Sequence, residues 1–449
     1  MSLENMFMAR SVAVIGASTT PGKTGHTILK NIIDGGYTGE VFPVNPRATE
    51  ILGKKAYRDL TSIGHPVDLM VVVVPAPAVP GIMAEARQAG IKAAVIITGG
   101  FGEIGNTQME KNIVEEARAG GIRIVGPNSQ GFNYTHNNLC ATWPLVTRKG
   151  PIAIVSQSGT VGAAISGWAE EEGLGISGFV GLGNKSDVSE LELMEFFGQD
   201  PATKVIALYI ERVKDGPAFL KIAGEIAERK PIVVLKGGRT PQGRVAAQSH
   251  TRSVAGRYEV FQAACRKIGI IPAKDVTELY DYAKAAAFLP KPPGRRFAVV
   301  TSSGGSGILA TDAAVDAGFE IASLSSEVKE ILKAKLPPQC VVSNPLDLTG
   351  DATSDRYLAA VETIASHAAA DVYALVFGDP IPGALEAVQA MRREAPGPVG
   401  VVYIGGGQVG KDEAFRMQAQ GIPVFPTPER AVKSLAALLQ ARKTFASVV

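Results

Sequence analysis

The stretch SVAVIGASTTPGKTGHTILKNII, residues 11–33, decides the fold class of this chain. Its first five residues form an apolar run of strand length, residues 16–22 a turn rich in Gly, Ser and Thr, and residues 25–33 a stretch with helical spacing. The same alternation continues along the chain, with glycines clustered after apolar runs. Continuous apolar strands between helices predict a parallel sheet covered on both faces.

Further apolar runs divide the chain into three sets. We predict strands at 40–44, 69–74, 93–97, 123–125, 151–155, 205–210, 231–235, 296–301, 373–377 and 401–404, and helices at 81–89, 258–267 and 428–443. The Pro-rich segment LPKPPG, residues 289–294, indicates a stiff linker. We therefore expect an α/β protein with three doubly wound domains, at about residues 1–145, 146–290 and 291–449.

Composition excludes several classes of protein. Hydrophobic residues make up 46% and charged residues 20%, as in an ordinary globular protein, and the net charge of +2 gives no basic field for nucleic acid. Three scattered cysteines argue against a disulfide framework and fit a reducing cytosol. The N-terminus lacks the apolar core of a signal peptide, and the apolar runs are too short to span a membrane. These features predict a cytoplasmic protein with neither membrane nor nucleic-acid partners.

His250 is the candidate nucleophile. It lies in AQSHTRSVAG, residues 247–256, which we expect to be an exposed loop between a strand and a helix, where catalytic groups are often carried. An imidazole there can hold a covalent intermediate, or it can be an ordinary hydrogen-bonded histidine. The other four histidines are scattered singly and the cysteines lie far apart, so we expect no metal site.

The turn at residues 16–22 is expected to bind a phosphorylated ligand, because it follows the first strand of a doubly wound sheet. It is not the GxGxxG pattern, and the second strand leads into Asn45 and Arg47 rather than into the carboxylate that would hold the ribose of NAD. Ser18, Lys23 and Arg47 suit the phosphates of coenzyme A better. A tight turn beside a solvated arginine is the simpler alternative, and an NAD-linked oxidoreductase is disfavoured.

Two further Ser/Gly turns, VSQSGTVG at residues 155–162 and TSSGGSGI at 301–308, also stand between a strand and a helix. Free backbone N–H groups at a helix N-terminus favour an anion, although such turns are common in α/β proteins. Glu211 ends the strand 205–210, where a carboxylate can orient an imidazole or simply be solvated.

The segment QSHTRSVAG resembles the SHTGSLAG-type loop of the nucleoside-diphosphate-forming acyl-CoA synthetases, the relatives of succinyl-CoA synthetase and ADP-forming acetyl-CoA synthetase. VIGAS…PGKTG, FPVNPR, VVVVPAPAV, ITGGFGE and GPNSQG match the CoA-binding domain of that family in order. The resemblance covers roughly residues 8 to 443. It implies an N-terminal Rossmann-like CoA-binding domain followed by two flavodoxin-like ligase domains.

The resemblance also implies roles for individual residues. His250 would be phosphorylated during turnover and paired with Glu211. The residues expected near CoA are Gly16, Ser18, Lys23, Asn45, Arg47, Pro75 and Thr98. Two helix N-termini would stabilise the phosphoryl group, with Ser156, Ser158, Gly159, Thr160, Ser303, Gly304, Gly305 and Ser306. The segments 181–187 and 344–350 match family loops that line the site, without assigned chemistry.

The implied function is that of the α subunit of an ADP-forming acyl-CoA synthetase of the acetate type. It would interconvert a small carboxylate, CoA and ATP with acyl-CoA, ADP and phosphate. The sequence has neither a P-loop nor an ATP-grasp pattern, so we expect a separate ATP-grasp β subunit that binds ATP or ADP with Mg, giving a hetero-oligomer. Arg252 replaces a residue that is small in the family. It supports the alternative of a CoA-binding regulatory or scaffold protein without turnover.

Overall fold

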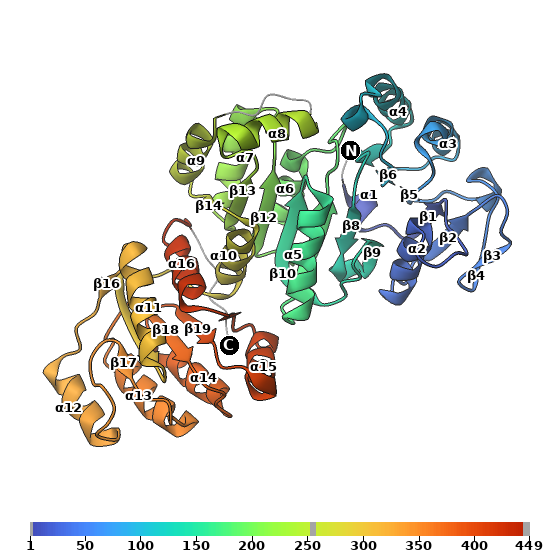
Figure 1. The fold of residues 1–449 in the computed structure, drawn as a ribbon. Helices are drawn as coiled ribbons and strands as arrows, with labels where there is room; N and C mark the ends of the chain where they lie inside the picture. Colours follow the sequence, from blue (N-terminus) through green and yellow to red (C-terminus); the bar gives the residue numbers. More distant parts are fainter. Residues whose placement is uncertain (1–2, 252–256, 443–449) are drawn as a thin grey trace. The chain divides into compact units, whose positions relative to one another are not determined.

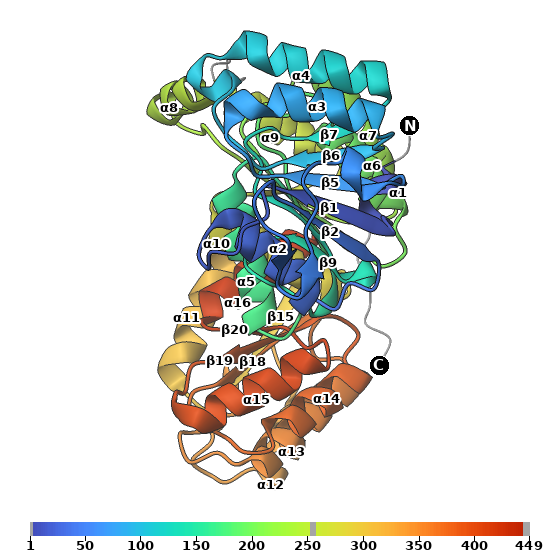
Figure 2. The same ribbon diagram turned by 90° about the vertical axis from the view of Figure 1, so that its right-hand side faces the viewer.

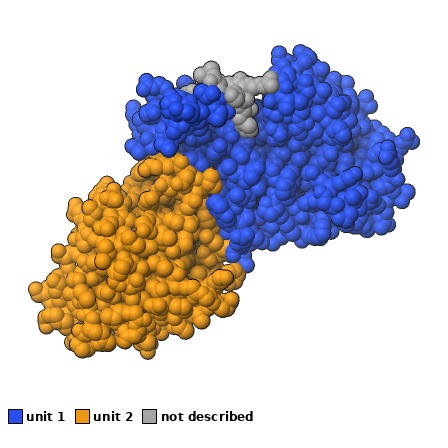
Figure 3. Space-filling view, in the orientation of Figure 1, with its two compact units in different colours: residues 1–171, 175–226, 234–268 blue, residues 172–174, 227–233, 269–449 orange. Residues whose placement is uncertain are grey.

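The structure is a computed structural model that describes residues 3–251 and 257–442, the side chains of 248–251 excepted. The chain forms two compact units, coloured separately in Figure 3. The first unit comprises residues 1–171, 175–226 and 234–268, and the second comprises 172–174, 227–233 and 269–449. Figure 1 labels the helices and strands.

The first sheet has five strands in the order β2-β1-β5-β6-β7. Its strands are β1 (Ser11–Ile15), β2 (Glu40–Val44), β5 (Leu69–Val72), β6 (Ala93–Ile96) and β7 (Arg123–Val125). The helices of this region are α1 (Glu4–Phe7), α2 (Thr24–Asp34), α3 (Val79–Gln88) and α4 (Thr107–Gly120), with a small hairpin of β3 (Glu50–Ile51) and β4 (Lys54–Lys55).

Both faces of the first sheet are covered. Helices α3 and α4 lie side by side, and Figure 2 shows them together. Their apolar side chains, such as Met83 and Ile113, share one core with Ala13 and Ile15 of β1. The alternate residue Val14 is also fully buried, as expected for a parallel strand with helices on both sides.

The second sheet has seven strands in the order β14-β13-β12-β10-β11-β8-β9. Its strands are β8 (Gly131–Tyr134), β9 (Leu139–Thr142), β10 (Lys149–Ser156), β11 (Ile176–Gly181), β12 (Val205–Ile210), β13 (Ile232–Lys236) and β14 (Ile271–Ala273). The helices are α5 (Gly159–Glu171), α6 (Glu190–Gln199), α7 (Gly216–Ala227), α8 (Pro241–Thr251), α9 (Tyr258–Lys267) and α10 (Val276–Phe288). The hairpin β8–β9 joins β11 in antiparallel fashion, which the sequence analysis did not anticipate.

The third sheet has six strands, with β16-β15-β18-β19-β20 in order and β17 paired to β15. They are β15 (Arg296–Thr301), β16 (Glu320–Ile321), β17 (Leu346–Asp347), β18 (Val372–Phe377), β19 (Val399–Tyr403) and β20 (Val424–Phe425). The helices are α11 (Gly304–Asp316), α12 (Ser326–Lys335), α13 (Ser354–Ser366), α14 (Ala384–Glu394), α15 (Gly407–Ala419) and α16 (Pro428–Leu438).

The three sheets share one arrangement around a central strand. β1 lies between β2 and β5, β10 between β11 and β12, and β15 between β16 and β18, and these pairings are all parallel. The central strand is therefore the point at which the strand order reverses, and ligands of open α/β sheets bind at the carboxyl edge of that point. Each predicted phosphate-binding turn directly follows one of these central strands.

The predicted α/β fold with doubly wound sheets is confirmed, but one local prediction is wrong. The segment through His250 is helix as far as Thr251, not loop. Thr240 caps this helix by accepting a hydrogen bond from the Gly243 N–H at 3.0 Å, and Pro241 begins it. The three-domain boundaries near residues 145 and 290 stay a prediction.

Within residues 3–251 and 257–442, no helix combines the length and the apolarity needed to cross a membrane.

Candidate active site

The residues predicted to meet CoA gather at one edge of the first sheet. Gly16 and Ser18 follow β1, Asn45 and Arg47 follow β2, and Pro75 and Thr98 follow β5 and β6. Because these four strands are parallel neighbours, their carboxyl ends lie together. Lys23 stands at the N-cap of α2 on the same side. The structure thus brings all seven residues to one edge, and their contact with CoA stays a prediction.

The turn after β1 requires glycine at two positions. Gly16 has φ +89°, a conformation that residues with side chains rarely adopt. A Cβ on Gly25 would lie 2.1 Å from the carbonyl oxygen of Gly16. The first turn of α2 therefore approaches the loop backbone closely, as at a site where backbone N–H groups face an anion.

Polar side chains fix the shape of this edge. The Asn45 amide donates to the Ala17 carbonyl at 2.8 Å and accepts the Arg47 N–H at 2.8 Å. The Thr98 hydroxyl donates to the Val74 carbonyl at 2.7 Å, beside Pro75. Lys23 and Arg47 are exposed, so their charges are available to an anionic ligand.

Each of the two Ser/Gly turns leads into the N-terminus of a helix. Ser158 accepts the Val161 N–H, and Gly159 begins α5 directly after β10 ends at Ser156. In the third sheet Ser303 caps α11 by accepting the Ser306 N–H, and it also accepts the Ser306 hydroxyl at 2.9 Å. Thr160, Gly304 and Gly305 lie in the first turns of these helices. The predicted meeting of both turns at a phosphohistidine is not tested.

Glu211 lies in a cavity of about 270 Å³ within the first unit. It is buried, with only 8% of its surface exposed. The Tyr209 hydroxyl donates to its carboxylate at 3.4 Å, and burial, followed by the Glu211 charge, raises the pKa of Tyr209 to about 12. Gln157 of the first Ser/Gly turn lines the same cavity, so Glu211 and that turn are brought together.

The other wall of this cavity comes from the turn η3 (Gly102–Ile104) and from helix α4. The Asn184 amide donates to Glu103 at 2.7 Å and to Glu110 at 2.8 Å, and the Ser186 hydroxyl donates to Glu110. Burial acts to raise the pKa of Glu103, but the hydrogen bonds from Asn184 and from backbone N–H groups outweigh it and hold that pKa below its usual value. The segment 181–187 therefore joins the two sheets at the cavity.

Two lysines with little exposed side-chain surface stand beside Glu211. The Lys185 ammonium lines the cavity and pairs with Glu190 at 2.7 Å, and Lys236 is 7% exposed at the end of β13. Burial lowers the pKa of both lysines. Gln157 and Lys185 lie in segments that the sequence predicts to line the site, but without a role of their own, and Lys236 was not predicted as a site residue.

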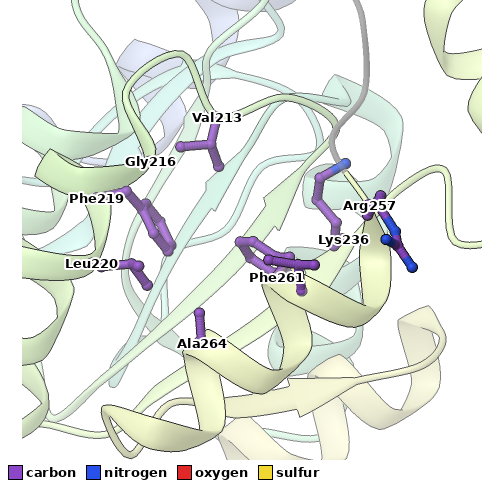
Figure 4. A pocket seen from close by; sticks show the side chains of 9 residues that line it. Val213, Gly216, Phe219, Leu220, Lys236, Arg257, Phe261 and Ala264 are labelled. Carbon is purple, nitrogen blue, oxygen red and sulfur yellow. The ribbon is translucent and has the colours of Figure 1, made fainter.

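A second pocket in the first unit, of about 430 Å³, lies between α7 and α9. Figure 4 shows its apolar walls, with the rings of Phe219 and Phe261, and the stem of Lys236 along one side. The Lys236 nitrogen is at the end of that side chain farther from the rings (Figure 4). This pocket is therefore mainly apolar, and Lys236 and Arg257 are the charged residues that line it.

The candidate nucleophile, His250, belongs to helix α8. The backbone of His250 lies in the last turn of α8, but its side chain is outside the described part of the structure, and so is Arg252. Pairing of His250 with Glu211 stays a prediction. Among the residues that are described, no group of three or more His, Cys, Asp or Glu side chains could hold a metal ion.

Three family models match this chain in sequence. They are a CoA binding domain at residues 10–135, a succinyl-CoA ligase like flavodoxin domain at 149–286 and a ligase-CoA domain at 297–381. Together they leave unmatched residues 1–9, two short connecting segments and residues 382–449.

Relatives of known name match over most or all of the chain. The α subunit of ADP-forming acetate–CoA ligase I from Pyrococcus furiosus is 40% identical over 98% of this chain and 97% of its own length. The ADP-forming acetate–CoA ligase of Methanocaldococcus jannaschii is 43% identical over 77% of this chain, which corresponds to 49% of that longer protein. The fold of acetyl-coenzyme A synthetase 1 from Ca. Korarchaeum cryptofilum, solved with phosphate and ADP, superimposes with a TM-score of 0.89 and 36% identity, over 98% of this chain and 97% of that one.

Proposed function

The chain belongs to the family of ADP-forming acetate–CoA ligases, and we propose that the phosphoryl group of the ligase reaction passes through its His250. The chain is the α subunit of such an enzyme, an acid–thiol ligase that interconverts carboxylate, CoA and ATP with acyl-CoA, ADP and phosphate. The alternative of a regulatory or scaffold protein is not favoured, because the relatives that match over the full chain are ligase subunits.

In the direction that makes ATP, the reaction has three steps. A phosphate oxygen attacks the thioester carbonyl, the C–S bond breaks, and CoA leaves as the thiol while an acyl phosphate forms. The imidazole of His250 then takes the phosphoryl group, the P–O bond to the acyl group breaks, and the carboxylate is released. Phospho-His250 finally passes the group to ADP and regains a free imidazole.

Glu211 is assigned to orient the imidazole of His250. A carboxylate that accepts a ring N–H selects one tautomer and leaves the other nitrogen free to attack. The observation that carries this assignment is the cavity in which buried Glu211 lies beside Gln157 of the first Ser/Gly turn. The N–H groups at Ser158–Thr160 and Ser303–Ser306 would stabilise the phosphoryl oxygens.

The carboxyl edge of the first sheet is assigned to CoA. Exposed Lys23 and Arg47 suit its phosphates, and the close approach of α2 to Gly16 leaves backbone N–H groups for an anion. Gly16, Ser18, Asn45, Pro75 and Thr98 complete this edge.

The nucleotide is assigned to another chain. We expect an ATP-grasp β subunit that holds ATP or ADP with Mg, because the relative from Methanocaldococcus jannaschii is about twice as long as the region it shares with this chain. A cytoplasmic location fits the free thiols of Cys140, Cys265 and Cys340. Three domains, with boundaries near residues 145 and 290, remain part of this proposal.

A reconstitution assay tests the function. The chain is mixed with an ATP-grasp subunit of the same organism, and ATP formed from acetyl-CoA, phosphate and ADP is measured. We expect ATP from the mixture and none from either chain alone, and His250→Ala should abolish it while CoA binding is kept. Turnover by the purified chain alone, or undiminished turnover in His250→Ala, would contradict the proposal.

A further inference from the structure

The two residues that follow β12, Glu211 and Arg212, are held by side chains rather than by the sheet. Gln157 accepts the N–H groups of Glu211 and Arg212 at 2.6 and 2.9 Å. The Lys236 ammonium donates to the Glu211 carbonyl, and the Lys185 ammonium donates to the Arg212 carbonyl at 2.8 Å. All four backbone hydrogen-bonding groups of this pair are therefore bonded to side chains.

These three side chains come from three other strands of the same sheet. Gln157 follows β10 and Lys236 ends β13, the two neighbours of β12, and Lys185 lies in the loop after β11. Residues far apart in sequence thus converge on one dipeptide. The backbone at Glu211 cannot shift without breaking contacts to several strands at once.

The arrangement is costly for the fold. Both ammonium groups are buried, and the hydrogen-bond partners of Lys236 are two carbonyl oxygens, those of Glu211 and Gly237. Burying a charge is unfavourable unless it is well bonded. Lys185 also has φ +57°, in the left-handed region that non-glycine residues seldom occupy. Energetically unfavourable features of this kind, such as buried charges and strained backbone, are common where a functional group must be held in place.

We propose that Gln157, Lys185 and Lys236 are positioning residues that fix the backbone of Glu211 and Arg212, and thereby the Glu211 carboxylate, for the transfer of phosphate to His250. This role rests on the proposed function. It requires neither lysine to touch the substrate. Because a misplacement of about 1 Å can slow a reaction by about a hundredfold, loss of one of these contacts should be visible in the rate.

The test measures the single-turnover rate at which the chain is phosphorylated from acetyl-CoA and labelled phosphate, with the partner subunit present. Lys236→Met keeps the apolar stem but removes the charge that holds the Glu211 carbonyl. We expect a loss between about tenfold and about a hundredfold, with unchanged affinity for CoA. Lys214→Met is the matched control, since Lys214 is exposed and only three residues from Glu211. It should keep the wild-type rate.

A double-variant cycle with Glu211→Gln separates positioning from general stability. If Lys236 acts through the Glu211 carboxylate, Lys236→Met should cost little more once that carboxylate is gone. A Lys236→Met chain as fast as wild type would overturn the proposal, and so would losses that multiply in the double variant. Gln157→Leu, in the same cycle, serves if Lys236→Met does not fold. Absence of label in wild type would instead contradict the proposed function itself.

Discussion

Arg47 is the residue at which we expect CoA to be distinguished from dephospho-CoA. Its side chain is exposed at the edge where the first sheet is expected to bind the 3′-phosphate. Arg47→Ala should weaken CoA by about 1.5–3 kcal/mol and weaken dephospho-CoA less, because a charge-assisted contact is lost only with the former. Calorimetric titration measures both. Arg10→Ala, at the opposite end of β1, is the control, and equal losses for both ligands would remove Arg47 from this role.

Gly25 is the residue at which a single methyl group should disturb the CoA edge. A Cβ there would lie 2.1 Å from the Gly16 carbonyl oxygen, whereas a Cβ at Gly81 of α3 would meet nothing within 4 Å. Gly25→Ala should lower the free energy of unfolding by about 2 kcal/mol or more. Gly81→Ala should leave it unchanged or raise it slightly. Denaturant unfolding measures both, and similar values for the two variants would refute the close contact.

The residues that the sequence could identify are those whose role follows from their place on one strand or turn. Glu211 was predicted to lie at the ligand-binding edge, because a carboxylate at the carboxyl end of an apolar strand in a doubly wound sheet faces that edge. The sequence does not predict the contacts that Gln157, Lys185 and Lys236 make with Glu211 and Arg212. These residues belong to different strands and loops, and only the sheet order brings them together. Without that order, a Gln inside a Ser/Gly turn gives no signal of its own.

At the scale of elements, α8 shows why the His250 segment was predicted wrongly. The stretch from Pro241 contains Gly and several polar residues, which favoured a loop. The pair Thr240 and Pro241 is, however, a helix start, with a capping hydroxyl followed by Pro in the first turn. Weighing that signal would have placed His250 in the last turn of a helix.

The turn η3 (Gly102–Ile104) depends on the charge of Glu103. Its carboxylate accepts the Asn184 amide and the Gly100 and Phe101 N–H groups, which hold its pKa below the usual 4.5. A lowered folded pKa gives stability that is present above about pH 4.5 and is lost as the pH falls through the folded pKa. Glu103→Gln should therefore cost about 1–2 kcal/mol at pH 7, and the cost should shrink as the pH falls below about 4.5.

Thermal unfolding at a series of pH values measures this difference. The exposed Glu50→Gln variant is the matched control. A gap between wild type and Glu103→Gln that stays constant from pH 7 to about pH 3 would show that the charge of Glu103 has no part in holding the turn.

At the scale of the whole molecule, the repeated sheet pattern was predictable and the strand order was only partly so. The apolar runs predicted the strand–turn–helix units that begin with β1, β10 and β15, and the structure places each of these strands at the centre of its sheet. The hairpin β8–β9 escaped prediction because its strands of four residues mix Gly, Asn, Cys and Thr with apolar residues. Its place depends on pairing with β11, which no local pattern specifies.

The purified chain should be stabilised by CoA and not by NAD. A ligand bound only to the folded state raises stability by mass action, by about 2.7 kcal/mol at a concentration of 100 Kd. Thermal unfolding with each ligand measures the shift, and Arg47→Ala should reduce the shift produced by CoA. A shift with NAD and none with CoA would contradict the family-based account of the first sheet.

Mapping the phosphoryl group on the chain tests most directly whether this group passes through His250. The protein is incubated with its partner subunit, acetyl-CoA and radiolabelled phosphate, and the labelled peptide is identified. We predict an acid-labile, base-stable label on His250, absent in His250→Ala and slower to form in Glu211→Gln. A label that persists in His250→Ala, or no label with a competent partner and several acyl-CoAs, would contradict this prediction.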